Sequence, residues 1–131
     1  DLPSFKKLNQ KYPNTIFDII INKKNYINID KERFKDMRIR ILNLSNNNLK
    51  LIDEKAFSGI KYLESLDLSY NYFDNIGFII KNFEEISEKN LKNFTSLNLN
   101  GNYILKLDKI FPSNLKNLKE LYLNYNDISS I

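Results

Sequence analysis

The chain of 131 residues is long enough to form one domain with a buried core, and 42% of its residues are hydrophobic. Its 20 Lys and Arg residues outnumber 16 Asp and Glu residues, which gives a formal net charge of +4. Because the sequence has no His and no Cys, it excludes imidazole bases, thiol nucleophiles and the usual zinc ligands. Its three glycines are isolated and exclude a phosphate-binding loop. We therefore expect no enzyme, no cofactor and no metal site.

The first fifteen residues place apolar side chains at nearly helical spacing, at Leu2, Phe5, Leu8 and Tyr12, behind a possible cap at Asp1 or Ser4. The spacing predicts an N-terminal capping or flanking segment over residues 1–15. Two readings stay open: a capping helix, or the return limb of an earlier repeat. No apolar run approaches the length of a membrane span, and no signal peptide is present, so we expect a processed product or a fragment of a longer protein.

One apolar pattern, L-x-x-L-x-L-x-x-N-x-L, then recurs along the rest of the chain. It occupies residues 39–49, 63–73, 94–104 and 118–128, and a degenerate copy begins at Ile16. The innermost strand leucines, Leu44, Leu68, Leu99 and Leu123, are separated by 24, 31 and 24 residues. Such a period is typical of a solenoid. The pattern predicts strands near residues 16–22, 39–45, 63–69, 94–100 and 118–124.

Each pattern position has a physical role. Side chains alternate across a strand, so the leucines of L-x-L point into the core and the residue between them points out. One asparagine per repeat stands where the chain leaves the strand, and its amide offers both a donor and an acceptor to buried backbone groups. These residues predict a structural asparagine ladder of Asn47, Asn71, Asn102 and Asn126. Lys24 takes this position in the first repeat, where we expect an irregular turn.

The interval from Leu68 to Leu99, which belongs to the third repeat, is seven residues longer than its neighbours because of a segment at residues 77–93. Ile79, Phe83, Ile86 and Leu91 recur there at intervals of mostly three to five residues, which favours an amphipathic helix. We expect this insertion to be a helix that fills the convex side. The alternative is that it forms a partner site.

The segment from Leu42 to Asn71 resembles the typical leucine-rich-repeat subclass, with about 24 residues per repeat and a Phe on the return limb, here Phe57. The resemblance covers residues 16–131. It is similar to the repeats of extracellular leucine-rich-repeat receptors, small matrix proteoglycans and insect immune proteins. It implies an α/β-type solenoid of about five repeats, with a short-stranded parallel concave sheet and an irregular or helical convex side. The family implies recognition of a protein partner through the concave face. The missing cysteines and the long third repeat depart from the family pattern.

The outward strand positions, among which alternation places Ser45 and Ser69, put candidate contacts on the concave face. Their charges nearly balance, which argues against a nucleic-acid groove, since that needs a basic stripe. Exposed tyrosines gather toward the C-terminal half, and Tyr is frequent at interface hot spots. The candidate partner-binding residues are Tyr70, Tyr122, Tyr125, Asp67, Asn98 and Arg40. Phe17, Ile20 and Ile41 form a second apolar patch.

These features favour a secreted or receptor-like recognition module that binds a protein. The alternatives are an intracellular scaffold or regulatory subunit, and a substrate-binding part of a larger enzyme. Two glycosylation sequons begin at Asn43 and Asn93, whereas the absence of cysteine favours a reducing compartment. An extracellular location is slightly favoured over a cytoplasmic one. Because the sequence stops in mid-repeat at Ile131, we also expect possible self-association through repeat ends.

Overall fold

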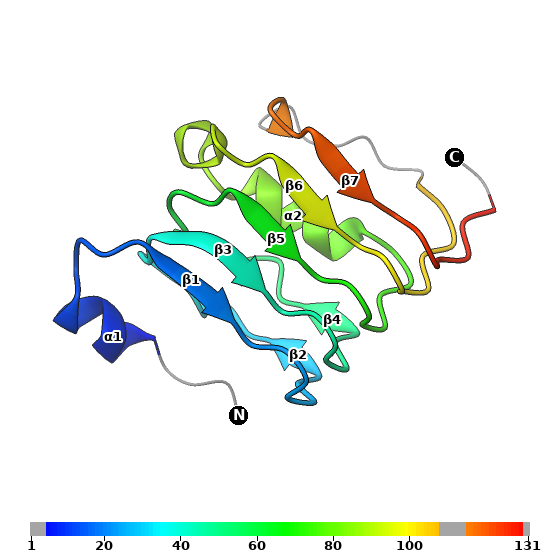
Figure 1. The fold of residues 1–131 in the computed structure, drawn as a ribbon, viewed down its shortest axis with the longest axis horizontal. Coiled ribbons are helices and arrows are strands. Elements are labelled where there is room, and N and C mark those ends of the chain that lie inside the picture. Colours follow the sequence, from blue (N-terminus) through cyan, green and yellow to red (C-terminus); the bar gives the residue numbers. More distant parts are fainter. Residues whose placement is uncertain (1–4, 108–114, 130–131) are drawn as a thin grey trace.

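The repeats build one parallel sheet whose strands follow each other in chain order. The computed structural model describes residues 5–107 and 115–129. In this part of the chain the strands of the sheet are β1 (Phe17–Ile20), β3 (Ile39–Asn43), β5 (Ser65–Asp67), β6 (Ser96–Asn98) and β7 (Glu120–Tyr122). Figure 1 shows them side by side, with the chain returning behind the sheet after each strand. This arrangement confirms the predicted leucine-rich-repeat solenoid.

Equivalent leucines of successive repeats are aligned by the strand register. Leu42 pairs with Leu66, Leu66 with Leu97, and Leu97 with Leu121. The first three of these leucines are fully buried. Since neighbouring strands lie about 4.8 Å apart, each leucine packs on its counterpart in the next repeat and extends one continuous core.

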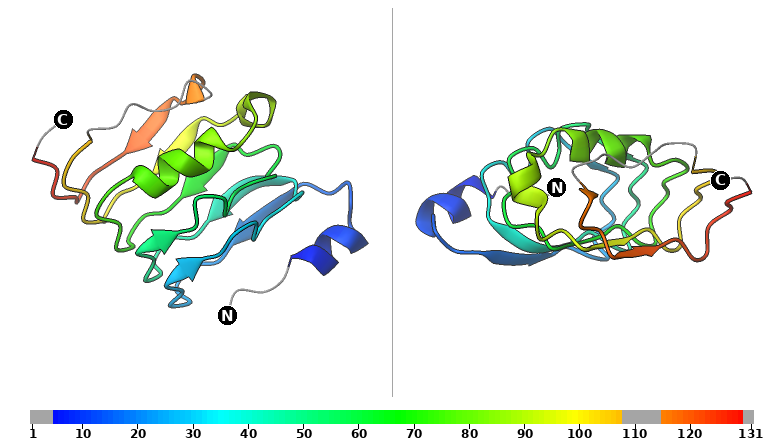
Figure 2. Two further views of the ribbon diagram at one scale, coloured as in Figure 1. Left: turned by 180° about the vertical axis from the view of Figure 1, so that it is seen from behind. Right: turned by 90° about the horizontal axis from the view of Figure 1, so that it is seen from above.

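The core is closed on the convex side by short elements. The segment at residues 77–93 contains α2 (Gly77–Glu84) and the 3₁₀ helix η1 (Glu88–Leu91). Figure 2 shows α2 on the side of the molecule opposite the sheet. Its Ile79, Ile80 and Phe83 are buried, and the Phe83 ring lies 4.9 Å from that of Phe94. A second, two-stranded sheet of β2 (Asn28–Ile29) and β4 (Leu51–Ile52) lies on the return limbs, which the sequence pattern did not predict.

The N-terminal end of the core is covered by α1 (Lys6–Lys11) and the residue before it. The Phe5 ring stacks on Phe34 at 5.3 Å, and Leu8 packs against the core. The proposed caps Asp1 and Ser4, as well as Leu2 and Ile131, lie outside the described residues. No helix in the described ranges has the length and apolar character that crossing a membrane requires.

The repeat asparagines form a chain of hydrogen bonds through the turns. Asn71 Nδ2 donates to the carbonyl oxygens of Leu44 and Leu68, each at 3.1 Å, while its Oδ1 accepts from the Leu49 amide at 3.0 Å. Asn47, Asn102 and Asn126 repeat this pattern. Each side chain thus bonds its own repeat and the preceding one, which satisfies backbone groups that water does not reach.

The first repeat turns differently where Lys24 replaces the asparagine. The amides of Lys24 and Tyr26 both donate to Asn47 Oδ1, at 3.0 and 3.3 Å. Lys23 has the left-handed backbone that this position also has in the later repeats, whereas Asn25 adds a second left-handed residue, with φ of 61°. The bond from Tyr26 is the one that every ladder asparagine accepts from the preceding repeat, so the additional bond from Lys24 is what distinguishes this turn.

Candidate partner-binding face

Three of the candidate residues form a row across the concave sheet. Asp67 on β5 pairs in register with Asn98 on β6, and Asn98 pairs with Tyr122 on β7. Asp67 and Asn98 are half-buried, while Tyr122 is 38% exposed. Side chains that share a register position on adjacent strands point to the same face, so the three line one strip of the concave surface.

The first two residues of this row also shape the ends of their strands. Asp67 Oδ1 accepts a hydrogen bond from the Ser69 amide at 2.9 Å, and Asn98 Oδ1 accepts one from the Asn100 amide at 3.0 Å. This local turn draws Ser69 inward to 4% exposure, and the same turn at Asn43 draws Ser45 inward to 4%. The alternation argument placed both serines on the outer face, and this was wrong because the strands end before them.

Tyr70 and Tyr125 lie one turn further on, at a position where successive repeats have left-handed backbones. Their φ angles are 54° and 58°, and Gly101 stands between them in the stack at 67°. A Cβ on Gly101 would lie 2.4 Å from Cδ1 of Tyr70, so the Tyr70 ring covers this glycine. Tyr125 is the most exposed of the large apolar side chains in the described ranges, at 78%. Tyr70 and Tyr125 thus belong to the repeats on either side of Gly101, at the carboxyl-terminal ends of the strands.

The phenol of Tyr122 is held by a neighbour on its own strand. Tyr122 Oη donates a hydrogen bond to Glu120 Oε2, across the spacing of two residues that places both on one face. This bond and the negative charge of Glu120 raise the pKa of Tyr122. The phenol therefore stays neutral, with its ring fixed along β7.

Arg40 stands apart from the tyrosines. It lies on β3, where its guanidinium binds both oxygens of Asp18, with Nε–Oδ1 at 3.0 Å and Nη2–Oδ2 at 2.6 Å. Its Nε is also 4.0 Å from Glu64 Oε2. The bond with Asp18 raises the pKa of Arg40 further. Asp18 and Glu64 thus already interact with the guanidinium group that a partner would bind.

A stacked tyrosine pair extends the aromatic surface and was not singled out by sequence reasoning. The rings of Tyr72 and Tyr103 lie 5.8 Å apart and are nearly parallel, at 4°. They are 44% and 51% exposed. Each directly follows a ladder asparagine, Asn71 or Asn102. Because Tyr occupies this repeat position in two adjacent repeats, the sequence could have predicted the pair.

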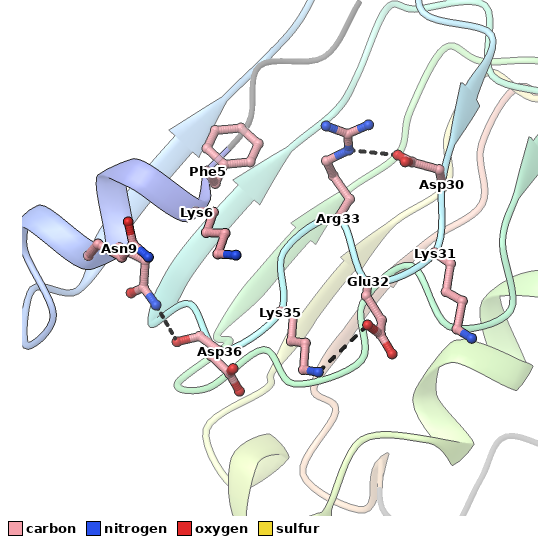
Figure 3. Close-up of a pocket in the computed structure, with 10 residues that line it drawn as sticks. Phe5, Lys6, Asn9, Asp30, Lys31, Glu32, Arg33, Lys35 and Asp36 are labelled. Atoms are coloured by element: carbon pink, nitrogen blue, oxygen red, sulfur yellow. Dashed lines mark hydrogen bonds and ion pairs between the residues drawn. The ribbon is translucent and has the colours of Figure 1, made fainter.

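A hollow of about 560 Å³ lies elsewhere, between α1 and residues 30–36. Figure 3 shows two ion pairs among its charged side chains: Arg33 with Asp30, whose atoms are 2.6 Å apart, and Lys35 with Glu32, at 3.7 Å. The Arg33 bond lowers the pKa of Asp30. Within residues 5–107 and 115–129, no three acidic side chains gather as metal ligands would.

Comparison with known proteins agrees with the fold. Residues 18–76 match the family model described as leucine rich repeat. Leucine-rich repeat-containing protein 3B of Bos taurus, of Mus musculus and of Homo sapiens is in each case 38% identical over 66 residues. The match covers 49% of this chain and 25% of each relative, so the chain spans about a quarter of their length.

The parallel sheet, the asparagine ladder and the family match over residues 18–76 together define the class of fold: the chain is built as a leucine-rich-repeat solenoid. Domains of this family generally mediate protein–protein interaction and are typically non-catalytic, because the repeats present an extended surface. The matched family and relatives are not enzymes by name.

Proposed function

We propose that this chain is a non-catalytic recognition module that binds a protein partner through the carboxyl-terminal half of its concave face. The observation that carries the proposal is the pair of tyrosines, Tyr70 and Tyr125, that flank Gly101 beside the row of Asp67, Asn98 and Tyr122. As in the extracellular leucine-rich-repeat proteins that the repeats resemble, we place this recognition outside the cell.

The chemistry of this surface suits a protein more than a small ligand. Tyrosine side chains provide large contact area at a low cost in conformational entropy, since only two torsions must be fixed. The Tyr70 ring lies against Gly101, and the Tyr122 phenol is hydrogen-bonded to Glu120 before any partner arrives. A preorganised aromatic surface with polar neighbours matches the anatomy of protein interfaces. We assign Arg40 a lesser role, because Asp18 already occupies its guanidinium.

The test is partner capture from the source organism with the unchanged domain and with a Tyr70→Ala/Tyr122→Ala/Tyr125→Ala variant. Ala fits the left-handed positions no worse than Tyr, so circular dichroism should show an intact fold. We expect the variant to lose the partner and a Tyr12→Ala control, which removes an exposed tyrosine near α1, to keep it. A partner that the triple variant retains would contradict the proposal and favour the scaffold alternative.

We also propose that the chain self-associates through its last repeat. Leu121, Leu123 and Ile128 are only partly buried, whereas their counterparts Leu97 and Leu99 are fully buried. A second copy packed against β7 would cover these side chains. Sedimentation velocity over a wide concentration range tests this, and a monomer at every concentration would contradict it.

A further inference from the structure

A second hollow lies at the opposite ends of the strands, where the chain enters the concave sheet. It encloses about 340 Å³ and is formed by the segments that precede β3, β5 and β6. We name this hollow the entry-side hollow. Its lining residues are Arg38, Lys61, Tyr62, Lys89, Asn90, Lys92 and Asn93.

The entry-side hollow is lined by four cations and no carboxylate. Lys61, Lys89 and Lys92 make no ion pair with any residue of the described ranges. The hollow beside α1 differs, since carboxylates also line it and pair with two of its cations, Arg33 and Lys35. Nearby, Glu88 is already bound by Lys116. Positive charge that no neighbouring carboxylate offsets attracts an anion from solution.

An aromatic ring stands at the rim of this hollow in a costly conformation. Tyr62 is 45% exposed and has a left-handed backbone with φ of 68°, which bulky residues rarely adopt. The Arg38 guanidinium lies 5.9 Å from the ring centroid and is itself anchored to the Pro13 carbonyl oxygen and, at 3.4 Å, to Asn14 Oδ1. The ring is therefore held beside the cations instead of in the core.

We propose that the entry-side hollow binds a sulfated sugar chain. A sulfate ester keeps its negative charge at every physiological pH and pairs with the ammonium groups of Lys61, Lys89 and Lys92. The amides of Asn90 and Asn93 offer donors and acceptors to sugar hydroxyls. The exposed face of Tyr62 packs against the apolar face of a sugar ring.

Other anions fit this surface less well. A nucleic acid needs a basic stripe that follows its backbone, and these cations form a compact group. The adjacent concave face includes Asp18, Glu64 and Asp67, which would repel a phosphate backbone that continued across the sheet. An acidic peptide would engage the lysines but leaves the amides and the ring without a role.

The test is the affinity of the whole chain, made in bacteria so that Asn93 carries no glycan, for a fluorescent heparin octasaccharide. We expect binding that weakens with salt and falls roughly tenfold or more in a Lys89→Glu/Lys92→Glu variant, because two favourable charges become repulsive. The matched control, Lys50→Glu/Lys106→Glu, has the same change in net charge at exposed sites outside the hollow, and it should change affinity less than about twofold. Tyr62→Ala should weaken binding without changing how steeply the affinity falls with salt concentration.

Three results would overturn the proposal. Equal losses in the two charge variants would mean attraction by net charge alone. A desulfated octasaccharide that binds equally well would exclude sulfate recognition. A single-stranded oligonucleotide or an acidic peptide of the same charge that binds more tightly would assign the hollow to another ligand. None of these results depends on the tyrosines of the concave face, so this proposal and the protein-recognition proposal fail separately.

Discussion

At the scale of single residues, the ladder asparagines are the side chains on which the repeat turns depend. Asn71 is 3% exposed, and its amide reaches Leu44, Leu68 and Leu49 at once. A shorter side chain leaves several buried backbone groups without partners, and each such group costs free energy. The amide is thus a structural part of two repeats rather than a surface contact.

We expect Asn71→Ala to lower the free energy of unfolding by about 3 kcal/mol, because buried donors and acceptors lose their partner. Asn126→Ala removes the same atoms from a half-buried turn, where water replaces part of the loss, and should cost about 1 kcal/mol. Urea unfolding followed by circular dichroism measures both. Equal losses in the two variants would show that burial does not determine how much each ladder asparagine contributes to stability.

The pair of Tyr122 and Glu120 gives a prediction on ionisation. The carboxylate accepts the phenolic hydrogen bond and repels a phenolate, so it favours the neutral phenol and raises the pKa of Tyr122. Glu120→Gln removes the charge and should lower this pKa toward that of an ordinary tyrosine. An NMR titration that monitors the Tyr122 ring resonances measures the change. An unchanged pKa would show that the phenol does not donate to Glu120.

The ladder was predictable from sequence because the L-x-L spacing fixes where each strand turns inward. Other roles depend on contacts between distant segments. Asn82 is fully buried, yet nothing in its local sequence separates it from the many surface asparagines of this chain. Ser69 was misplaced because strand alternation holds only while the strand continues, and the bond to Asp67 ends it.

At the scale of elements, the side chain of Asn82 hydrogen-bonds the inserted helix α2 to the preceding repeat. Asn82 Nδ2 donates to the carbonyl oxygens of Asp53 at 2.8 Å and Phe78 at 2.9 Å. Its Oδ1 accepts from the Phe57 amide at 2.9 Å. The amphipathic spacing predicted this helix, but the residue that positions it became evident only from the structure.

Asn82→Ala should therefore lower the free energy of unfolding by about 2–3 kcal/mol and speed hydrogen exchange at the Phe57 amide. Asn90→Ala is the control, since within the described ranges the Asn90 side chain bonds to the Ser87 hydroxyl alone, at an exposed site. It should cost less than about 0.5 kcal/mol. Unaltered exchange at Phe57 in the Asn82 variant would mean that α2 is held by its apolar face alone.

Gly101 and Tyr70 form a second contact between elements. Gly101→Ala places a methyl group where the Tyr70 ring lies and adds the cost of Ala at positive φ, about 1 kcal/mol. We expect a total loss of about 2 kcal/mol in the natural background and about 1 kcal/mol when Tyr70 is also Ala. Chemical unfolding of the four proteins in this cycle measures the coupling. Identical losses in both backgrounds would show that the ring does not rest on the glycine.

At the scale of the whole molecule, the two proposed binding surfaces lie at opposite ends of the concave strands. The entry-side hollow with Lys89 and Lys92 lies where the strands begin, and the exposed Tyr70 and Tyr125 lie where they end. The repeat period allowed the tyrosine positions to be predicted. It did not reveal the entry-side hollow, since three segments of unequal length form it, or that Asp18 holds Arg40.

Burial also differs between the two ends of the solenoid, and this predicts where it opens first. Phe5 and Leu8 cover the first repeat, whereas Leu121 and Leu123 in the last are only half-buried. In a repeat protein, stability is a sum of repeat and interface contributions, so the end with less buried apolar surface opens at lower free energy.

The amides of Leu68 and Glu120 allow a direct comparison, since each donates to a carbonyl of the adjacent repeat at 2.9 Å. Native-state hydrogen exchange at low protein concentration should show a smaller protection factor for Glu120, with Leu68 exchanging only through global unfolding. If the last repeat self-associates, the Glu120 amide alone gains protection as the concentration rises. Equal protection at both sites under dilute conditions would mean that the repeats unfold as one cooperative unit despite their unequal burial.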